Sequence, residues 1–428
     1  MTRGQKDVFS GHNAQRISVM NTVMPQSNEE ENGLSREETI FIQAHMQDEV
    51  SQLMLRANQF KGFDIKKLAG QIQSRQKALK KLPEWSANPE LVFPPALSVE
   101  QSSSEGTARY KASLVSGKQL IDITGGMGVD CFYMSQRFQN VQYFEQQEAV
   151  AATASWNFKH LGANNIHVTA HNSLEGLAND KFTADWIYAD PARRNANREK
   201  VVLLSDCTPD IVPHLDLLFE IAPNILLKTS PILDIDLAAK SLRNLKEVHV
   251  IGYEGECKEL LFVLQKGYDN QAFDIKIRIV DGYGNALHKL DFNREMERDA
   301  PVPYSEPLQY LYEPHAAVLK AGAFKTICPV FLFAKIATNS QLYTSQHLET
   351  AFPGRAFQVV AVCKPDMRDI AKHLDGDKAN ITVRNFPVKS EELRKKWKLK
   401  DGGAFYLFAT TLSDNTKVVI VTKKPQTA

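Results

Sequence analysis

The stretch Leu120-Ile-Asp-Ile-Thr-Gly-Gly-Met-Gly-Val-Asp130 decides the fold of this chain. An apolar segment that is typical of a strand runs directly into a loop with glycines at 125, 126 and 128, and a helical pattern follows. Because glycine has no Cβ, such a loop lets bare backbone approach a ligand closely. The pattern predicts a ligand site at the carboxyl edge of a parallel sheet, although a tight turn between a strand and a helix would look similar.

Short apolar segments alternate with helical patterns from residue 118 to about 268. This alternation predicts an α/β fold with a doubly wound parallel sheet. Only residues 252–259 separate the last two strands, and a connection that short forces them to be antiparallel. We expect strands at 119–123, 141–145, 166–169, 185–189, 224–228, 247–252 and 260–265.

Polar residues follow the second, third and fourth of these strands. Glu145 lies where a carboxylate can accept hydrogen bonds from both hydroxyls of a ribose. Asn172 and Ser173 can meet an adenine edge, or they can simply cap the next helix. Asp190-Pro-Ala-Arg-Arg194 begins a turn that its proline stiffens, which fixes the direction of the neighbouring carbonyl groups. We therefore expect these side chains to face one ligand.

In this order, the features resemble class I S-adenosylmethionine (SAM)-dependent methyltransferases. Asp122–Gly128 resembles their first motif, Glu145 matches their ribose-binding acid, and Asn172 falls where many members have an adenine-facing Asp. The resemblance implies a Rossmann-like seven-stranded sheet and SAM as the cofactor. The implied cofactor-binding residues are Asp122, Thr124, Gly125, Gly126, Met127, Gly128, Glu145, Asn172 and Ser173.

The turn after the fourth strand resembles the Asp-Pro-Pro-x motif of amino- and RNA-modifying members. Asp190, Pro191, Ala192 and Arg193 are the implied catalytic residues. Methyl transfer depends mainly on positioning, and Asp190 and the Pro191 carbonyl can accept hydrogen bonds from an exocyclic amine. We therefore expect methylation of a base nitrogen. Ala192 replaces the second proline and Arg193 replaces a frequent aromatic residue, so the target atom stays open.

Glu313–Gly322 and the stretch from Lys335 to Ser345 resemble a bacterial methyltransferase family with a ferredoxin-like insert and a C-terminal THUMP-like domain. This resemblance implies an RNA substrate, tRNA or rRNA. The expected organisation is a disordered leader (1–34), a helical region and connector (35–117), the SAM-dependent methyltransferase domain (118–268), a small ferredoxin-like β insert (269–312) and a THUMP-like α+β domain (313–428). Within it we expect a capping box at Ser35 and Glu38, some extended structure in 83–117, a helix over 307–324 and a strand near 329–335.

Two basic segments support contact with a phosphate backbone. Residues 61–81 contain seven Lys or Arg and one acid, and residues 384–400 contain seven and two acids. Solvated lysine-rich helix faces would have the same composition. Arg193, Arg194 and Arg198 could also hold a phosphate at the pocket mouth. The candidate substrate-binding residues are Arg194, Arg198, Lys228, Arg394, Lys395 and Lys396. Lys228 emerges from the fifth strand and could equally cap a helix.

The composition excludes several other classes. The 51 Lys and Arg nearly balance the 50 Asp and Glu, so the global charge identifies no partner. The five cysteines form no close pair, which argues against a disulfide framework or a zinc site and favours a reducing compartment. No apolar run approaches the ~18 residues of a membrane span. We expect a cytoplasmic protein with no membrane partner and no metal.

Two other functions stay open. A non-catalytic RNA-binding protein with a degenerate SAM-binding fold would fit the altered fourth motif. A nicotinamide-dependent oxidoreductase fits less well, because Cys131 replaces the third glycine of Gly-x-Gly-x-x-Gly and the sheet ends antiparallel. A covalent route would need a thiolate beside the target base. Cys257 is the candidate near the sheet edge, and packing is the more ordinary role for it.

Overall fold

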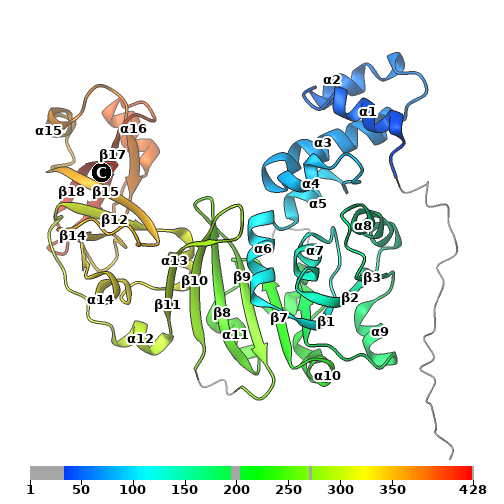
Figure 1. Cartoon of the computed structure of the whole chain (residues 1–428). Coiled ribbons are helices and arrows are strands. Elements are labelled where there is room, and N and C mark those ends of the chain that lie inside the picture. Colours follow the sequence, from blue (N-terminus) through cyan, green and yellow to red (C-terminus); the bar gives the residue numbers. More distant parts are fainter. Residues whose placement is uncertain (1–32, 194–202, 269–271, 427–428) are drawn as a thin grey trace, which may run out of the picture.

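The computed structural model describes residues 33–193, 203–268 and 272–426. Figure 1 shows three parts in a row: a small helical part near the N-terminus, a large sheet flanked by helices, and a C-terminal part. The predicted leader at 1–34 falls almost wholly outside the described residues. Arg194 and Arg198 lie outside them as well.

Nine strands form the large sheet in the order β11-β10-β8-β9-β7-β4-β1-β2-β3. β1, β2, β3, β4 and β7 pair in parallel, whereas β9 runs antiparallel to both β7 and β8. The seven expected strands and the antiparallel end of the Rossmann-like sheet are therefore confirmed. Their bounds are β1 (Gly117–Asp122), β2 (Phe138–Phe144), β3 (Ile166–Thr169), β4 (Trp186–Ala189), β7 (Asn224–Thr229), β8 (Leu245–Tyr253) and β9 (Glu256–Gln265).

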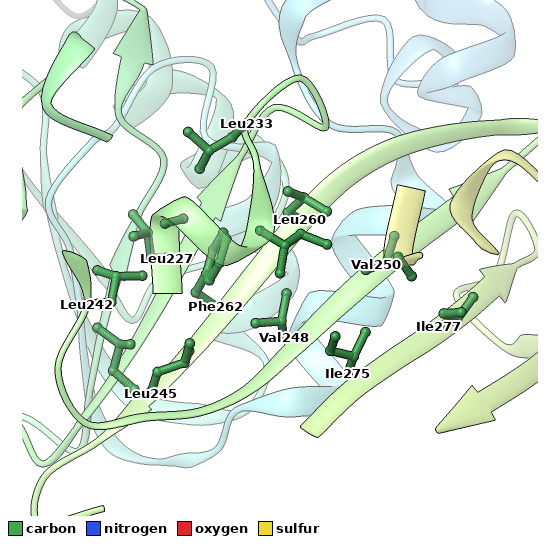
Figure 2. Close-up of a cluster of buried hydrophobic side chains, with 14 of the residues drawn as sticks. Leu227, Leu233, Leu242, Leu245, Val248, Val250, Leu260, Phe262, Ile275 and Ile277 are labelled. Carbon is green, nitrogen blue, oxygen red and sulfur yellow. The ribbon is translucent and has the colours of Figure 1, made fainter. Parts of the chain in front are cut away.

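Helices cover both faces of this sheet because its strands carry apolar side chains on both. In β9, Leu260, Phe262 and Leu264 join one buried cluster, while Leu261 and Val263 join the other, as the two-residue period of a strand requires. Figure 2 shows the first cluster continuing across β7, β8 and β10. The first cluster includes residues of α9 (Ser173–Asn179), α10 (Leu215–Ile221) and α11 (Ile235–Ser241), and the second includes residues of α6 (Glu105–Leu114), α7 (Val129–Ser135) and α8 (Glu148–His160).

The strand pair expected in a separate insert at 269–312 instead extends the large sheet. β10 (Asp274–Val280) pairs in parallel with β8, and β11 (Ala286–Phe292) pairs antiparallel with β10. Ile275 and Ile277 are fully buried in the same cluster as the β8 side chains. The pair therefore shares the core of the large sheet, and the sequence pattern did not reveal which sheet edge it would join.

A second sheet of seven strands forms the C-terminal part, in the order β13-β14-β12-β15-β18-β17-β16. The helix expected over 307–324 is wrong in its first half, because Leu311 and Tyr312 are buried on opposite faces of a strand that ends at Pro314. The strand near 329–335 shrinks to β13 (Ala334–Lys335). The remaining bounds are β12 (Tyr310–Pro314), β14 (Tyr343–Ser345), β15 (Gly354–Cys363), β16 (Asn380–Val383), β17 (Phe405–Thr411), β18 (Lys417–Lys423), α12 (Arg294–Asp299), α13 (Ala316–Ala321), α14 (Ile327–Phe331), α15 (Met367–Ile370) and α16 (Ser390–Trp397).

The N-terminal part is helical, as expected from residue 35 onward. The Ser35 and Glu38 side chains each accept a hydrogen bond from the other's backbone N–H, which confirms the predicted capping box. Some extended structure is expected in 83–117 from the sequence, but most of this segment is helical. One helix begins at Pro83, because the first helical position needs no N–H, and the Ser104 side chain caps α6. The helices are α1 (Arg36–Ala44), α2 (Val50–Leu55), α3 (Ile65–Lys81), α4 (Pro83–Ala87) and α5 (Ala96–Gln101), followed by α6.

Across the part of the chain that the structure describes, no helix combines the length and the apolar character that crossing a bilayer requires.

Candidate active site

A cavity of about 430 Å³ lies at the carboxyl edge of the large sheet. Its volume is within the usual range of small-molecule sites. The glycine loop forms one side, and the end of β7 and the segments after β2, β3 and β4 form others. Residues from α5 and the loop after it complete the wall. The lining includes residues 122–131, 144–147 and 171–174, together with Tyr188, Asp190, Ala192, Thr208, Pro209, Lys228, Ser98, Gln101, Ser102 and Ser103.

The three glycines of the loop have different roles. A Cβ on Gly125 would lie 2.6 Å from the Phe144 carbonyl oxygen, and a Cβ on Gly128 would lie 2.5 Å from the Phe158 ring. At Gly126, where φ is +82°, the nearest atom to an added Cβ is 4.0 Å away. Gly125 and Gly128 therefore allow close packing, whereas the space beside the Gly126 Cα is free of protein atoms.

Asp122 and Thr124 tie the glycine loop to the turn after β4. An Asp122 carboxylate oxygen accepts a hydrogen bond from the Thr124 N–H at 3.0 Å, and the Thr124 hydroxyl oxygen accepts one from the Asp190 N–H at 2.6 Å. Burial raises the pKa of the Asp122 carboxyl well above its usual range, and the carboxylates of Asp130 and Asp190 add to that rise. Through Thr124, Asp122 thus holds the glycine loop beside the turn that follows β4.

Glu145 fixes the glycine loop from the end of β2. Its two carboxylate oxygens accept hydrogen bonds from the Gly126 N–H at 2.8 Å and the Gln147 N–H at 2.7 Å. Each oxygen keeps acceptor capacity, because a carboxylate oxygen has two lone pairs. Asn172 caps α9 by accepting from Leu174 N–H at 3.1 Å, so its side-chain oxygen plays the structural role that the sequence left open. Its amide nitrogen is the group that can still donate to a ligand.

Lys228, at the end of β7, brings a positive charge to the cavity. Its Nζ lies 2.5 Å from an Asp190 carboxylate oxygen and 3.6 Å from an Asp130 carboxylate oxygen. Burial alone would lower the pKa of the Lys228 ammonium, but the carboxylates of Asp190, Asp130 and Glu259 outweigh it and raise that pKa. Lys228 therefore stays an ammonium beside Asp190.

Asp130 is the centre of the charges behind the cavity. It accepts hydrogen bonds from the Ser103 hydroxyl at 2.8 Å and the Tyr188 hydroxyl at 2.7 Å, and Lys111 Nζ lies 3.2 Å away. Burial opposes ionisation, yet Lys111 and Lys228 prevail and lower the pKa of Asp130 to about 2. Asp130 is thus held as a carboxylate between two lysine side chains in the protein interior.

The cavity brings together most of the predicted site residues. The nine implied cofactor-binding residues line it, as do Asp190, Ala192 and Lys228. Pro191 is buried behind the wall, and only the backbone of Arg193 is described. Arg394, Lys395 and Lys396 lie on α16, which Figure 1 shows at the far end of the molecule from β1 and β2.

Several lining residues were not predicted from the sequence. Asp130 follows the glycine loop by two positions, and that spacing could have marked it. Ser98, Gln101, Ser102 and Ser103 carry no comparable signal, because their distance from β1 in sequence says nothing about where they fold. Lys81 holds their segment in place, with Nζ 3.1 Å from the Val99 carbonyl oxygen.

The predicted basic segment on α3 is largely occupied by contacts within the protein. Lys67, Lys77 and Lys80 pair with glutamates, and Arg75 is buried with three backbone carbonyl partners. In the second basic segment the Trp397 side chain is buried. Burial also raises the pKa of the Cys257 thiol to about 12, which disfavours the thiolate of a covalent route.

The comparisons with known proteins agree with this architecture. A ferredoxin-like domain family matches residues 310–353, and a THUMP domain-like family matches residues 354–424. The ferredoxin-like match thus begins near the end of the segment 269–312 predicted for it. A crystal structure of a candidate methyltransferase from Porphyromonas gingivalis W83 is 31% identical, with a TM-score of 0.82, covering 91% of this chain and 98% of that one.

This chain belongs to the same methyltransferase family. An rRNA methylase from Streptococcus thermophilus is 11% identical with a TM-score of 0.29, and it covers 37% of this chain and 94% of its own. A candidate methyltransferase from Streptococcus mutans, solved with S-adenosylhomocysteine, is 12% identical with a TM-score of 0.27, covering 37% of this chain and 94% of its own. The comparison with curated proteins finds no match.

Proposed function

We propose that this member of the family is a SAM-dependent methyltransferase that modifies RNA. The observation that carries the proposal is the convergence of Gly125–Gly128, Glu145 and Asp190 on one cavity. The free space beside the Gly126 Cα and the spare acceptor capacity of Glu145 fit a nucleoside cofactor. SAM would supply an activated methyl group there, and Asp122, Thr124, Met127, Asn172 and Ser173 would complete its binding site.

An RNA substrate, tRNA or rRNA, is supported by the THUMP domain-like match and by the exposed lysines of α16. Lys395 and Lys396 are the candidate phosphate contacts, whereas Arg394 already pairs with Asp401 at 2.7 Å. A base nitrogen as the acceptor stays a prediction from the resemblance of Asp190–Arg193 to the Asp-Pro-Pro-x motif. Non-catalytic RNA binding is the competing function.

Two measurements test this proposal. S-adenosylhomocysteine should raise the melting temperature and NAD should not, because a ligand at 100-fold its Kd stabilises a protein by about 2.7 kcal/mol. The protein should also transfer labelled methyl groups from SAM to RNA, and Asp190→Ala should abolish the transfer. Binding of S-adenosylhomocysteine without any transfer would instead favour the non-catalytic function.

A further inference from the structure

Two lysines and three carboxylates form a charge cluster directly behind the cavity. Lys111 Nζ lies 2.6 Å from a Glu259 carboxylate oxygen and 3.2 Å from Asp130. Lys228 Nζ lies 2.5 Å from Asp190 and 3.6 Å from Asp130. The five residues come from α6, α7, β7, β9 and the turn after β4, so only the tertiary fold assembles them. Asp130, Asp190 and Lys228 reach the cavity wall.

Stability alone does not explain why these charged side chains are buried together. Apolar side chains of similar volume often stabilise a core as well as buried ion pairs do. Charged groups with shifted pKa values beside a cavity are more typical of functional sites. The Lys228 side chain is 11% exposed and the Asp190 side chain 38% exposed, so both can meet a substrate on the cavity side.

The Asp190–Lys228 pair does not suit a nitrogen acceptor. A base nitrogen attacks with its lone pair, and an ammonium beside it would bind that lone pair. A hydroxyl acceptor, in contrast, needs both a base and a cation beside it. A carboxylate must take its proton, and a cation must stabilise the oxygen as negative charge develops on it. Asp190 and Lys228 supply these two groups within 2.5 Å of each other.

The altered fourth motif points the same way. Arg193 stands where an aromatic residue often stacks on a flipped base, and Ala192 stands in place of the second proline. Base stacking on aromatic side chains is how many proteins hold an unstacked base. A site that methylates the sugar does not need that platform, because the ribose lies on the accessible backbone.

We infer that the methyl acceptor is a hydroxyl oxygen of RNA, and the ribose 2′-hydroxyl is the hydroxyl that each nucleotide can offer. The hydroxyl oxygen bonds to the methyl carbon as the carbon–sulfur bond breaks, and that electron pair stays on sulfur. The hydroxyl proton passes to the Asp190 carboxylate, while Lys228 stabilises the oxygen. This inference rests on the proposed function and replaces the nitrogen acceptor in it.

The methylated product decides between the acceptors. The full-length protein is incubated with labelled SAM and unmodified tRNA and rRNA, and the RNA is then digested to nucleosides. We expect the label in 2′-O-methylnucleosides. Label in base-methylated nucleosides would overturn this inference and leave the proposed function standing. No label in RNA, together with no binding of S-adenosylhomocysteine, would overturn the proposed function itself.

A binding measurement tests the same contacts without turnover. With S-adenosylhomocysteine saturating, the protein is titrated with an RNA oligonucleotide and with DNA of the same sequence, which lacks the 2′-hydroxyl. Lys228→Gln and Asp190→Asn should each reduce the preference for RNA by roughly tenfold, because each removes a charged hydrogen-bond partner. Lys289→Gln, exposed on β11, is the matched control. A preference that is unchanged in both variants would refute the inference.

Discussion

Gly126 and Gly162 share a left-handed backbone, but only Gly126 lines the cavity. Their φ values are +82° and +74°, and an added Cβ would have no close neighbour at either position. A valine at each should therefore incur a similar backbone penalty, roughly 1–2 kcal/mol. At Gly126 the side chain would also fill space that the cofactor needs. We expect Gly126→Val to abolish the melting-temperature shift with S-adenosylhomocysteine.

Gly162→Val is the matched control for this experiment. It should lower the melting temperature of the free protein by a similar amount and keep the full ligand-induced shift. If Gly126→Val binds S-adenosylhomocysteine as tightly as the unmodified protein, the glycine loop does not face the cofactor.

Asp130 should contribute stability that depends on pH in a defined direction. Its folded-state pKa of about 2 is below the usual 3.8, so its contribution is full above about pH 4 and is lost as the pH falls towards 2. Asp130→Asn leaves Lys111 and Lys228 without this partner and should destabilise the protein by about 3 kcal/mol at pH 7. The difference in unfolding free energy should shrink in acid.

Chemical denaturation at several pH values between 7 and 2.5 measures that difference. Asp216→Asn, at a side chain that is 82% exposed, should change stability little at any pH. An Asp130→Asn destabilisation that stays constant down to the lowest pH would show that the ion pairs do not hold Asp130 ionised.

Local sequence signals explain which site residues could be predicted. Glu145, Asn172 and Asp190 follow strand ends, and in a parallel sheet all of these ends reach one edge. The sequence does not decide the role of Lys228, because its partner Asp190 is 38 positions away and the pair forms only when β4 and β7 are side by side. A partner that depends on tertiary contact leaves no periodic trace in sequence.

α5 and the loop after it give the N-terminal part a role in the cavity. Gln101 and Ser102 line it beside Ser103, which donates to Asp130. This wall lies beside the charged groups of the cavity, so it suits the amino-acid end of the cofactor. Gln101→Ala should weaken S-adenosylhomocysteine binding about tenfold, or about 1.4 kcal/mol.

5′-Methylthioadenosine, which lacks the amino-acid end, should bind Gln101→Ala and the unmodified protein equally. Calorimetric titration with both ligands measures this contrast, and Leu97→Ala on the exposed side of α5 is the control. An equal loss for both ligands would show that Gln101 does not contact the amino-acid end.

The elements that could not be predicted share one cause. β10 and β11 have the alternation of any hairpin, and only their packing against the β8 core assigns them to the large sheet. α4 and α5 have only five and six residues, and each begins at or directly after a proline, so their helical period is hard to recognise in the sequence. The seven central strands were predictable because buried strands between helices appear as continuous apolar runs.

In the whole molecule, α16 lies far from β1 and β2 (Figure 1), and the cavity forms at the carboxyl ends of these strands. An RNA that contacts both must extend along the molecule, so its affinity and its chemistry should be separable. Replacing Lys395 and Lys396 together by alanine should weaken RNA binding and reduce the salt slope by about one to two units, since each phosphate contact contributes about one. The melting-temperature shift with S-adenosylhomocysteine should not change.

The paired cations of α3 offer a contrast to those of α16. Lys77 and Lys80 already neutralise Glu100 and Glu254, at 2.6 and 3.0 Å, so binding a phosphate would require breaking an existing ion pair. Replacing both by alanine should therefore affect RNA affinity and the salt slope less than replacing Lys395 and Lys396. Fluorescence-anisotropy titrations at several salt concentrations measure both quantities. A larger loss from the α3 variant would mean that the RNA runs over the N-terminal helices, and α16 would then not be its anchor.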